Sequence, residues 1–511
     1  MRGGRLLGDL AGARGDPFAR VRGLPDPHRT QHHGAPAMTR PSAKPSAVRW
    51  LTRLEAGELS SRELTQRYLE RIERVEPHIG AVAALDPDGA LRAADEADRI
   101  RSRGEHRPLL GLPVTVKDSL EVRGLASTGG SLARAGHIPE RDAVVVARLR
   151  RAGAFVLAKT NAPEYSSSYE TANPLHGRTL HPLDPERTPG GSSGGEAALA
   201  AADATPLGIG TDGGGSIRVP AHYCGVVGLR PSAGRVPDTG NWPATRASGY
   251  MDFYCVGPIA RFVEDAEFVL PLIAGPDGID PYAVPAPLGS PEAVDPGVLR
   301  VGWFTDAPDV ASTPGTVAAV ATAARVLAGT GAQVREIEPP WEPGPTDLFL
   351  AAISADGGAQ MRSDLAGAGG RHEPDIASLL ETMEGRALTA GEWFALQRDI
   401  FSLRARVRAL FANVDVLVCP VAPGPAPRHG EPPGPRILEK PLRAFEFVHL
   451  FAVAGLPAAS VPVGREGELP VGVQVAGPPF REDIVLAAAR ALESAVGGFQ
   501  PLAPPAVEVV S

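Results

Sequence analysis

The sequence predicts an α/β protein built on a β-sheet with helices on both of its faces. Short apolar runs bounded by glycine or proline, residues 111–116, 155–158 and 206–210, are typical of buried strands. Segments with helical character, residues 142–152 and 196–204, alternate with these runs. Alternation of this kind favours a sheet that is covered by helices on both sides. Hydrophobic residues make up 43% of the 511-residue chain, which is enough for a large core.

The first predicted helix covers residues 60–75 and opens on a capping box. Ser60 is followed three positions later by Glu63, the pair that satisfies free amides at the start of a helix. Apolar residues recur on one face of this helix, at Leu64, Tyr68, Ile72 and Val75. A second helix is predicted over residues 86–103.

The alternation of helices and strands is less regular beyond Val226, but apolar runs and helix start and stop residues predict further elements there. Strands are predicted over residues 301–304, 415–419, 455–464 and 471–475. Helices are predicted over residues 314–329, 389–411 and 481–495. The proline-rich residues 421–441 are expected to form an irregular loop. Since no linker divides the chain, we expect a single domain over residues 38–505.

Residues 1–37 are predicted to be a disordered N-terminal extension. They are rich in Arg, Gly, Pro and His, and they lack the apolar segment of a secretory signal. Met38, followed by Thr-Arg-Pro, is a plausible true start of the protein. The histidines of this segment could bind a metal adventitiously, but a solvated tail is the simpler interpretation. They are His28, His32 and His33.

Charge and cysteine content exclude several classes of function. The formal net charge is −8, whereas binding of nucleic acid usually needs a basic face. No run approaches 18 uncharged apolar residues, so we expect no membrane-spanning helix. Cys224, Cys255 and Cys419 are too scattered for a disulfide framework or a CxxC metal site. The sequence therefore predicts a cytoplasmic protein with neither a nucleic-acid nor a membrane partner.

The chemistry is concentrated in residues 188–231, where two loops rich in Gly and Ser flank an alanine-rich segment. Ser192 lies in the first loop, and Ser216 lies in the second, 24 positions later. Three glycines precede Ser216, and consecutive amides without side chains can converge on one oxygen as an anion-binding nest. A nucleophilic hydroxyl beside such a nest is the minimum equipment for acyl transfer.

Two other motifs match inside the same stretch. Residues 208–213 fit GxGxxG, the dinucleotide-binding fingerprint, but the acidic residue expected about 20 positions later is missing and Asp238 is the nearest. Residues 191–195 fit GxSxG, the nucleophile elbow of α/β-hydrolases, which would make Ser193 the nucleophile. His449 follows Ser193 in the chain and could serve as its base, although the sequence around this histidine contains no recognisable motif.

Three blocks taken together resemble the signature of the amidase signature family. They are, in the family's order, GLPVTVKD with Lys117, GGSSGG with Ser192 and GTDGGGSIRVPA with Ser216. The likeness extends to the blocks TNAPEYSSSYETANP, GPIAR and AGLPAASVPVG, and it covers nearly all of residues 38–499. It implies the fold of that family, a large mixed β-sheet core covered by α-helices on both faces, and a catalytic role for the domain.

The resemblance also implies a role for each of these residues. Ser216 would be the nucleophile that forms the acyl-enzyme, and Lys117 would be the general base. Ser192, at an unusual cis peptide bond, would pass the proton between them. The implied oxyanion hole consists of the backbone amides of Gly213, Gly214, Gly215 and Ser216. The residues expected to support this loop are Ser193, Thr211, Asp212 and Arg218.

A lysine can act as a base here only if its amine is neutral. The free pKa of about 10.4 keeps lysine protonated at neutral pH, and burial can lower this pKa by roughly 3–5 units. We therefore expect Lys117 to be desolvated and the carboxylate of Asp118 to point away from it. No metal or organic cofactor is required, and no metal-ligand spacing such as HExxH is present in the sequence.

Departures from the family pattern bear on the substrate. Glutamine-using members carry an acidic residue upstream of the AGLP segment, where this chain has Phe445. The adjacent Glu446 would face the other way in a strand with period two. His181 stands where many members have Asn. Four aromatic residues are candidates either for an apolar acyl pocket or for ordinary core packing: Trp242, Tyr250, Phe253 and Tyr254.

We therefore expect an amidase that hydrolyses a small-molecule carboxylic amide to the acid and ammonia or an amine. The alternative within the family is the glutaminase subunit of a tRNA-dependent amidotransferase, which works in complex with partner subunits. A catalytically silent binding protein is a third alternative, and the intact Lys117, Ser192 and Ser216 oppose it. The sequence leaves open the identity of the acyl group and the formation of a homodimer.

Overall fold

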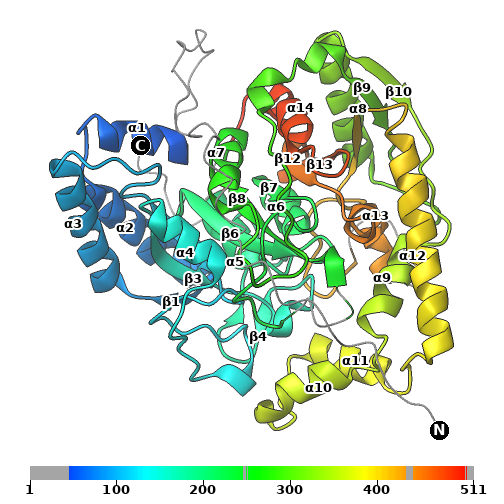
Figure 1. Ribbon diagram of the computed structural model, residues 1–511, viewed down its shortest axis with the longest axis horizontal. Coiled ribbons are helices and arrows are strands. Elements are labelled where there is room, and N and C mark those ends of the chain that lie inside the picture. Colours follow the sequence, from blue (N-terminus) through cyan, green and yellow to red (C-terminus); the bar gives the residue numbers. More distant parts are fainter. Residues whose placement is uncertain (1–44, 245–248, 250, 433–440, 501, 503–511) are drawn as a thin grey trace, which may run out of the picture. The chain divides into compact units, whose positions relative to one another are not determined.

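The computed structural model describes residues 45–244, 249, 251–432, 441–500 and 502 (Figure 1). The described residues belong to one compact unit. Residues 1–37, with their histidines, and Tyr250 lie outside the described part. The two ends predicted for the domain, residues 38 and 505, also lie outside it, so they stay predictions. None of the described helices is long and apolar enough to cross a membrane.

The described residues contain one large sheet and one small sheet. The strands of the large sheet are β1 (Val82–Leu85), β2 (Pro113–Lys117), β3 (Phe155–Thr160), β6 (Leu207–Asp212), β7 (Val227–Arg230), β8 (Cys255–Ala260), β9 (Arg300–Trp303), β10 (Gln333–Glu336), β11 (Val416–Pro420), β12 (Ala458–Glu466) and β13 (Leu469–Ala476). The small sheet pairs β4 (Ala172–Asn173) with β5 (Gly177–Arg178).

The large sheet is mixed in direction. Its spatial order is β1-β3-β2-β6-β8-β7-β12-β13-β11-β9-β10. Strands β3, β2 and β6 run parallel to one another, as do β11, β9 and β10. The other neighbouring pairs are antiparallel.

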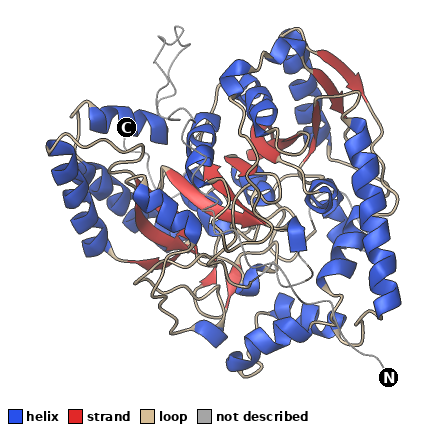
Figure 2. Cartoon of the chain, in the orientation of Figure 1, coloured by secondary structure: helices blue, strands red, loops and turns tan. Residues whose placement is uncertain are grey.

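Helices surround this sheet (Figure 2). In chain order the α-helices are α1 (Ala47–Glu55), α2 (Ser61–Ile79), α3 (Pro87–Ser102), α4 (Val144–Arg151), α5 (Gly194–Ala201), α6 (Arg218–Cys224), α7 (Val263–Ile273), α8 (Pro314–Gly329), α9 (Pro345–Ile353), α10 (Ala359–Leu365), α11 (Pro374–Met383), α12 (Ala390–Leu410), α13 (Glu446–Ala454) and α14 (Glu482–Val496). Short 3₁₀ turns connect several of them.

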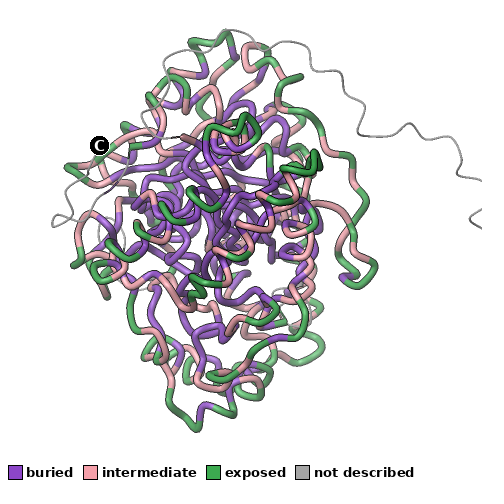
Figure 3. The backbone as a smooth tube through the Cα atoms, turned by 90° about the vertical axis from the view of Figure 1, so that its left-hand side faces the viewer, coloured by how far each residue is buried: buried purple, intermediate pink, exposed green. Residues whose placement is uncertain are grey.

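Strand β11 demonstrates that both faces of the sheet are covered. Val416 and Val418 belong to a core cluster that includes residues of α2, α4, α7, α8 and α14. Leu417 and Cys419 belong to a second cluster with residues of α9, α12 and α13. Since successive side chains of a strand point to opposite faces, the two clusters lie on opposite faces of the sheet. Figure 3 shows the buried backbone concentrated in the interior. The predicted fold class is confirmed.

Most of the predicted elements are present, with small shifts of their ends. The predicted strands correspond to β2, β3, β6, β9, β11, β12 and β13, and the predicted helices correspond to α2, α3, α4, α5, α8, α12 and α14. The capping box at Ser60 is formed, with the Ser60 hydroxyl and the Glu63 side chain each accepting a backbone N–H. Residues 421–432 form neither helix nor strand, and the next eight residues of the predicted loop lie outside the described part.

The prediction of a period-two strand at Glu446 is wrong. Glu446 is the first residue of α13, and Phe445 immediately precedes this helix. Every residue of α13 is buried, so the helix is apolar on nearly all sides and lacks the one-sided spacing by which helices are recognised. The short helix α6 was not predicted either, because its seven residues are all buried and include Pro220, so they show no one-sided apolar spacing.

The fold brings two strand ends together at one edge of the sheet. Strands β2 and β6 are parallel neighbours, with Thr115 opposite Gly208. Lys117 is the last residue of β2, and Asp212 is the last residue of β6. The carboxyl ends of neighbouring parallel strands lie at the same edge, which is where open α/β sheets bind ligands. Lys117 is therefore placed beside the glycine loop that follows β6.

Candidate active site

Lys117 is buried at the end of β2 and contacts two hydroxyl groups. Its Nζ atom lies 2.6 Å from Ser192 Oγ and 2.8 Å from Thr211 Oγ1. Both Lys117 and Ser192 are almost completely inaccessible to solvent. Burial lowers the pKa of Lys117 to about 7, although the charge of Asp212 acts to raise it. A large fraction of this amine is thus neutral near pH 7.

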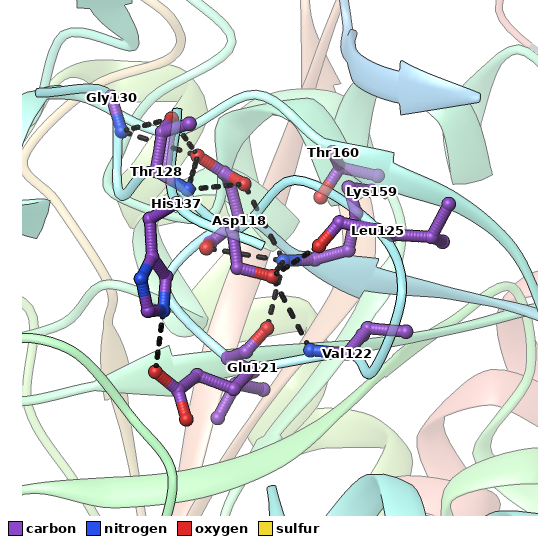
Figure 4. Close-up of polar contacts among 12 residues, drawn as sticks. Asp118, Glu121, Val122, Leu125, Thr128, Gly130, His137, Lys159 and Thr160 are labelled. Carbon is purple, nitrogen blue, oxygen red and sulfur yellow. Dashed lines mark hydrogen bonds and ion pairs between the residues drawn. The ribbon is translucent and has the colours of Figure 1, made fainter. Parts of the chain in front are cut away.

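Asp118 points away from Lys117, as predicted. Its carboxylate accepts hydrogen bonds from the Thr128 hydroxyl at 2.6 Å and from the backbone of Thr128 and Gly130 (Figure 4). It also forms an ion pair with Lys159 at 3.4 Å. Burial acts to raise the pKa of Asp118, but Lys159 and the donated hydrogen bonds lower it below its usual value. The carboxylate is therefore committed to a separate buried cluster.

Ser192 follows a cis peptide bond, Gly191–Ser192, as the family resemblance implies. The next residue ties this turn to the glycine loop, because Ser193 N–H donates to the Ser216 carbonyl at 3.1 Å. No hydrogen bond joins the hydroxyls of Ser192 and Ser216, two described residues, so their direct contact stays a prediction. The loop carrying Ser192 and the loop carrying Ser216 are nevertheless immediate neighbours.

Ser193 has a supporting position, which argues against the nucleophile-elbow alternative. Its hydroxyl donates to the Thr211 carbonyl and accepts from the Thr211 amide, both at 3.2 Å. The hydroxyl thereby fastens the start of α5 to β6. His449, the base that this alternative needs, contacts Tyr169 and Thr346 instead.

The dinucleotide-binding alternative also has a simpler explanation in packing. A Cβ atom at Gly208 would lie 2.0 Å from the Glu196 carboxylate, and one at Gly210 would lie 2.7 Å from the Ser193 hydroxyl. Both glycines lie inside β6, where they leave room for side chains of α5 and of the turn before it. Close helix–strand approach thus explains their lack of a side chain.

Asp212 organises the glycine loop. Its carboxylate accepts from Gly215 N–H at 2.8 Å and from Ile217 N–H at 3.2 Å. It is paired with two buried arginines, Arg218 at 2.9 Å and Arg230 at 3.2 Å. Burial alone would raise the pKa of Asp212, but these two guanidinium groups hold it well below its usual range. The carboxylate is therefore a permanently charged anchor for the loop.

One of the amides predicted for the oxyanion hole is already occupied. Because Gly215 N–H donates to Asp212, it points away from any substrate oxygen in this conformation. Gly213, Gly214 and Ser216 line a pocket of about 620 Å³, so the amides of these three residues are the remaining candidates. Ser216 is half-buried at the wall of this pocket.

The pocket is lined mostly by apolar side chains and by a few charged ones. Its apolar and aromatic side chains include Tyr169, Tyr223, Tyr254, Phe349, Leu350, Ile353, Leu379, Met383, Leu442 and Phe445. Its charged residues are Glu170, Asp375, Arg386 and Glu431. Such a pocket suits an organic group that carries few charges.

The four aromatic candidates have different positions. Tyr254 lines the pocket. Phe253 lies in a core cluster, and Trp242 packs edge-on against Tyr165 at 5.2 Å, so neither lines the pocket. For these two residues core packing is the correct alternative. His181 is not among the pocket-lining residues either, and its buried ring bonds to the Tyr223 carbonyl at 3.0 Å.

Sequence reasoning assigned no role to several residues that surround the loop. Tyr169 donates a hydrogen bond to the Gly214 carbonyl at 2.5 Å, and Phe349 lies where a Cβ atom at Gly214 would collide with it. Glu196 is fully buried and bonds to Thr115 and Thr160. No local signal marks these contacts. Among the described residues there is no cluster of three or more His, Cys, Asp or Glu side chains that could hold a metal.

The mixed sheet, with a buried lysine–serine pair and a glycine loop at one edge, defines the class of amidase signature hydrolases, which act on carbon–nitrogen amide bonds. The chain belongs to the amidase family, because the family model described as Amidase matches residues 63–486.

Relatives within this family have different activities. The chain is 34% identical over 466 residues to one of the subunits of glutamyl-tRNA(Gln) amidotransferase from Thermus thermophilus, covering 87% of this chain and 95% of that protein. It is 33% identical to indoleacetamide hydrolase of Bradyrhizobium diazoefficiens, and the match covers 88% of this chain and 86% of that protein. A solved structure of a peptide amidase with the competitive inhibitor chymostatin is 31% identical, with a TM-score of 0.78. The match covers 90% of this chain and 99% of the peptide amidase.

Proposed function

We propose that this protein hydrolyses a carboxylic amide through an acyl-enzyme on Ser216, with Lys117 as the base. The observation that carries the proposal is the contact of the buried Lys117 amine with the Ser192 hydroxyl, in a site that adjoins the substrate-sized pocket. A neutral amine with a pKa of about 7 can accept a proton near neutral pH.

The proposed reaction has two steps. Ser216 Oγ attacks the amide carbon while its proton passes to Ser192, and Ser192 gives its own proton to Lys117. The protonated Lys117 returns a proton through Ser192 to the leaving nitrogen, so ammonia or an amine departs and the C–N bond breaks. Water then attacks the acyl-enzyme by the same relay and releases the carboxylic acid.

The amides of Gly213, Gly214 and Ser216 are proposed to bind the oxygen that becomes negative during attack. Amides held rigidly in a site with little water stabilise such an oxyanion more strongly than water does. Their rigidity comes from Asp212, which two arginines keep charged.

The chemistry of the pocket favours an amide with an apolar acyl group over glutamine. Phe445 stacks on Tyr169 with ring centroids 3.5 Å apart, so an aromatic pair lines the pocket at the position where glutamine-using relatives carry an acidic residue. Glu446 is turned to α9, where it accepts from the Thr346 backbone at 2.9 Å. A role as the glutaminase component of an amidotransferase remains the second candidate, because the chain is 34% identical to a protein of such an enzyme.

We also propose a cytoplasmic location and action without a metal or organic cofactor. The three cysteines are free thiols buried in the protein, which suits a reducing compartment. The proposed relay uses only side chains and backbone amides of this chain.

The test of this function is hydrolysis of a panel of aliphatic, aryl and fatty amides together with glutamine, by wild type and two variants. Ser216→Ala should abolish turnover without lowering the melting temperature, because the half-buried hydroxyl makes no hydrogen bond among the described residues. Ser193→Ala is the contrasting variant, because complete loss of turnover from this change alone would favour the nucleophile-elbow alternative. Activity of Ser216→Ala within tenfold of wild type would refute the assignment, and preferred hydrolysis of glutamine would favour the amidotransferase alternative.

A further inference from the structure

A chain of hydrogen bonds ends on the glycine loop from the side opposite Asp212. Thr346, at the start of α9, lies 2.9 Å from His449 Nδ1. His449 Nε2 lies 2.9 Å from the Tyr169 hydroxyl, and that hydroxyl donates to the Gly214 carbonyl at 2.5 Å. The chain therefore links α9, α13 and the segment before β4 to the loop that carries Ser216.

The number of available protons fixes the direction of every bond in this chain. The Gly214 carbonyl can only accept, so the single proton of the Tyr169 hydroxyl goes to it. The hydroxyl must then accept from His449 Nε2–H. Burial, with a smaller effect of Arg218, lowers the pKa of His449 to about 3, so the ring is neutral and Nδ1 carries no proton. Nδ1 therefore accepts from the Thr346 hydroxyl.

The peptide unit between Gly214 and Gly215 is thus held at both of its ends. Its carbonyl accepts from Tyr169, and its N–H donates to Asp212. Glycine backbones rotate easily, and Gly215 has a φ of +120°, a conformation that other residues rarely adopt. Fixing this one peptide plane restricts the directions open to the two flanking amides, those of Gly214 and Ser216.

We propose that Tyr169, oriented by His449, is a positioning residue that holds the glycine loop in the form that binds the oxyanion. This inference rests on the proposed role of Ser216. It adds a function for the aromatic wall of the pocket, since Phe445 stacks on one side of Tyr169 while Phe349 stacks on His449 at 4.3 Å.

Variants at His449 distinguish a positioning role of Tyr169 from direct contact of Tyr169 with the substrate. Tyr169 lines the pocket, so its loss could also weaken substrate binding. His449 is fully buried and is not one of the pocket-lining residues, so its hydrogen bond can affect the reaction only through its neighbours. Variants at both positions are therefore needed.

The experiment measures the rate at which a long-chain alkyl fluorophosphonate modifies Ser216 in the full-length protein. Ser216 Oγ bonds to phosphorus, fluoride leaves, and the serine proton goes to Lys117 through Ser192. Charge develops on the phosphoryl oxygen, so the rate reports on the oxyanion hole without knowledge of the natural substrate. Tyr169→Phe and His449→Leu should each slow modification by about tenfold or more. His449→Gln, whose amide can still donate to Tyr169, should recover most of the rate.

Tyr165→Phe is the matched control. It removes a hydroxyl from the same segment, but this hydroxyl bonds to Asp364 and not to the loop, so the rate should match wild type. Wild-type rates for Tyr169→Phe, or equal losses for His449→Leu and His449→Gln, would overturn the inference. A wild-type protein that is not modified at Ser216 would instead refute the proposed function.

Discussion

Two buried lysines on neighbouring strands differ in the groups that surround their amines. Lys159 donates to the carbonyls of Asp118 and Leu120 and contacts the Asp118 carboxylate, three groups that can only accept a hydrogen bond, and it also donates to the Ser127 hydroxyl. Figure 4 shows Lys159 beside Asp118. Lys117 contacts hydroxyls of Ser192 and Thr211, which can donate as well as accept. The surroundings of Lys159 require an ammonium ion, whereas those of Lys117 accommodate a neutral amine. Burial lowers the pKa of both lysines, but the environment suits only Lys117 to be a base.

Asp212 is a second single residue whose surroundings lead to a prediction, and it should be important for stability as well as for activity. Asp212→Asn keeps the volume but leaves Arg218 and Arg230 buried without a carboxylate, which should lower the free energy of unfolding by about 3–5 kcal/mol. Urea denaturation measures this change. The control is Asp184→Asn, whose partly exposed pair with Arg187 should contribute about 0–1 kcal/mol. Equal losses for the two variants would contradict the anchoring role of Asp212.

Among the elements, α5 is joined to two strands of the sheet through the buried side chain of Glu196. Glu196 lies 2.5 Å from the Thr115 hydroxyl of β2 and 2.9 Å from the Thr160 hydroxyl of β3. The Thr115 hydroxyl also lies 3.1 Å from the Thr205 hydroxyl. Burial raises the pKa of Glu196 to about 8, because the threonines and lysines nearby only partly offset the loss of water. The junction between α5 and the sheet is thus neutral near pH 7.

This protonation predicts how stability depends on pH. The unfolded pKa of glutamate is about 4.3, so the folded state binds more protons between that value and about 8, and its stability falls as the pH rises through this range. Glu196→Gln mimics the protonated acid and should not show this loss. The free energy of unfolding of wild type, measured by denaturation from about pH 5 to 8, should fall by about 2–4 kcal/mol relative to the variant. A constant difference over this range would show that Glu196 is ionised in the folded protein.

Across the whole molecule, the sequence predicted features that lie within short segments, and it did not predict contacts between residues that are far apart in the chain. Lys117, Ser192 and Ser216 were identified because each lies in a short, distinctive block. The contact of Tyr169 with His449 joins residues 280 positions apart, and no spacing rule reveals such a pair. Helices buried on all sides, such as α13, carry no amphipathic signal. The disorder predicted for residues 1–37 stays a prediction, because they lie outside the described residues.

The pH dependence of acylation tests whether a neutral Lys117 activates Ser216, and it can be followed as the burst of p-nitroaniline from a p-nitroanilide with an apolar acyl group. Protonation removes the base, so the wild-type rate should rise with pH, reach half its maximum near the folded pKa of Lys117, about 7, and level off above it. Lys117→Arg keeps a positive charge that cannot be removed, and it should acylate about 10²–10⁴-fold more slowly. A wild-type rate that is flat from acid to neutral pH, or an Arg variant that acylates like wild type, would contradict the role of Lys117 as the base.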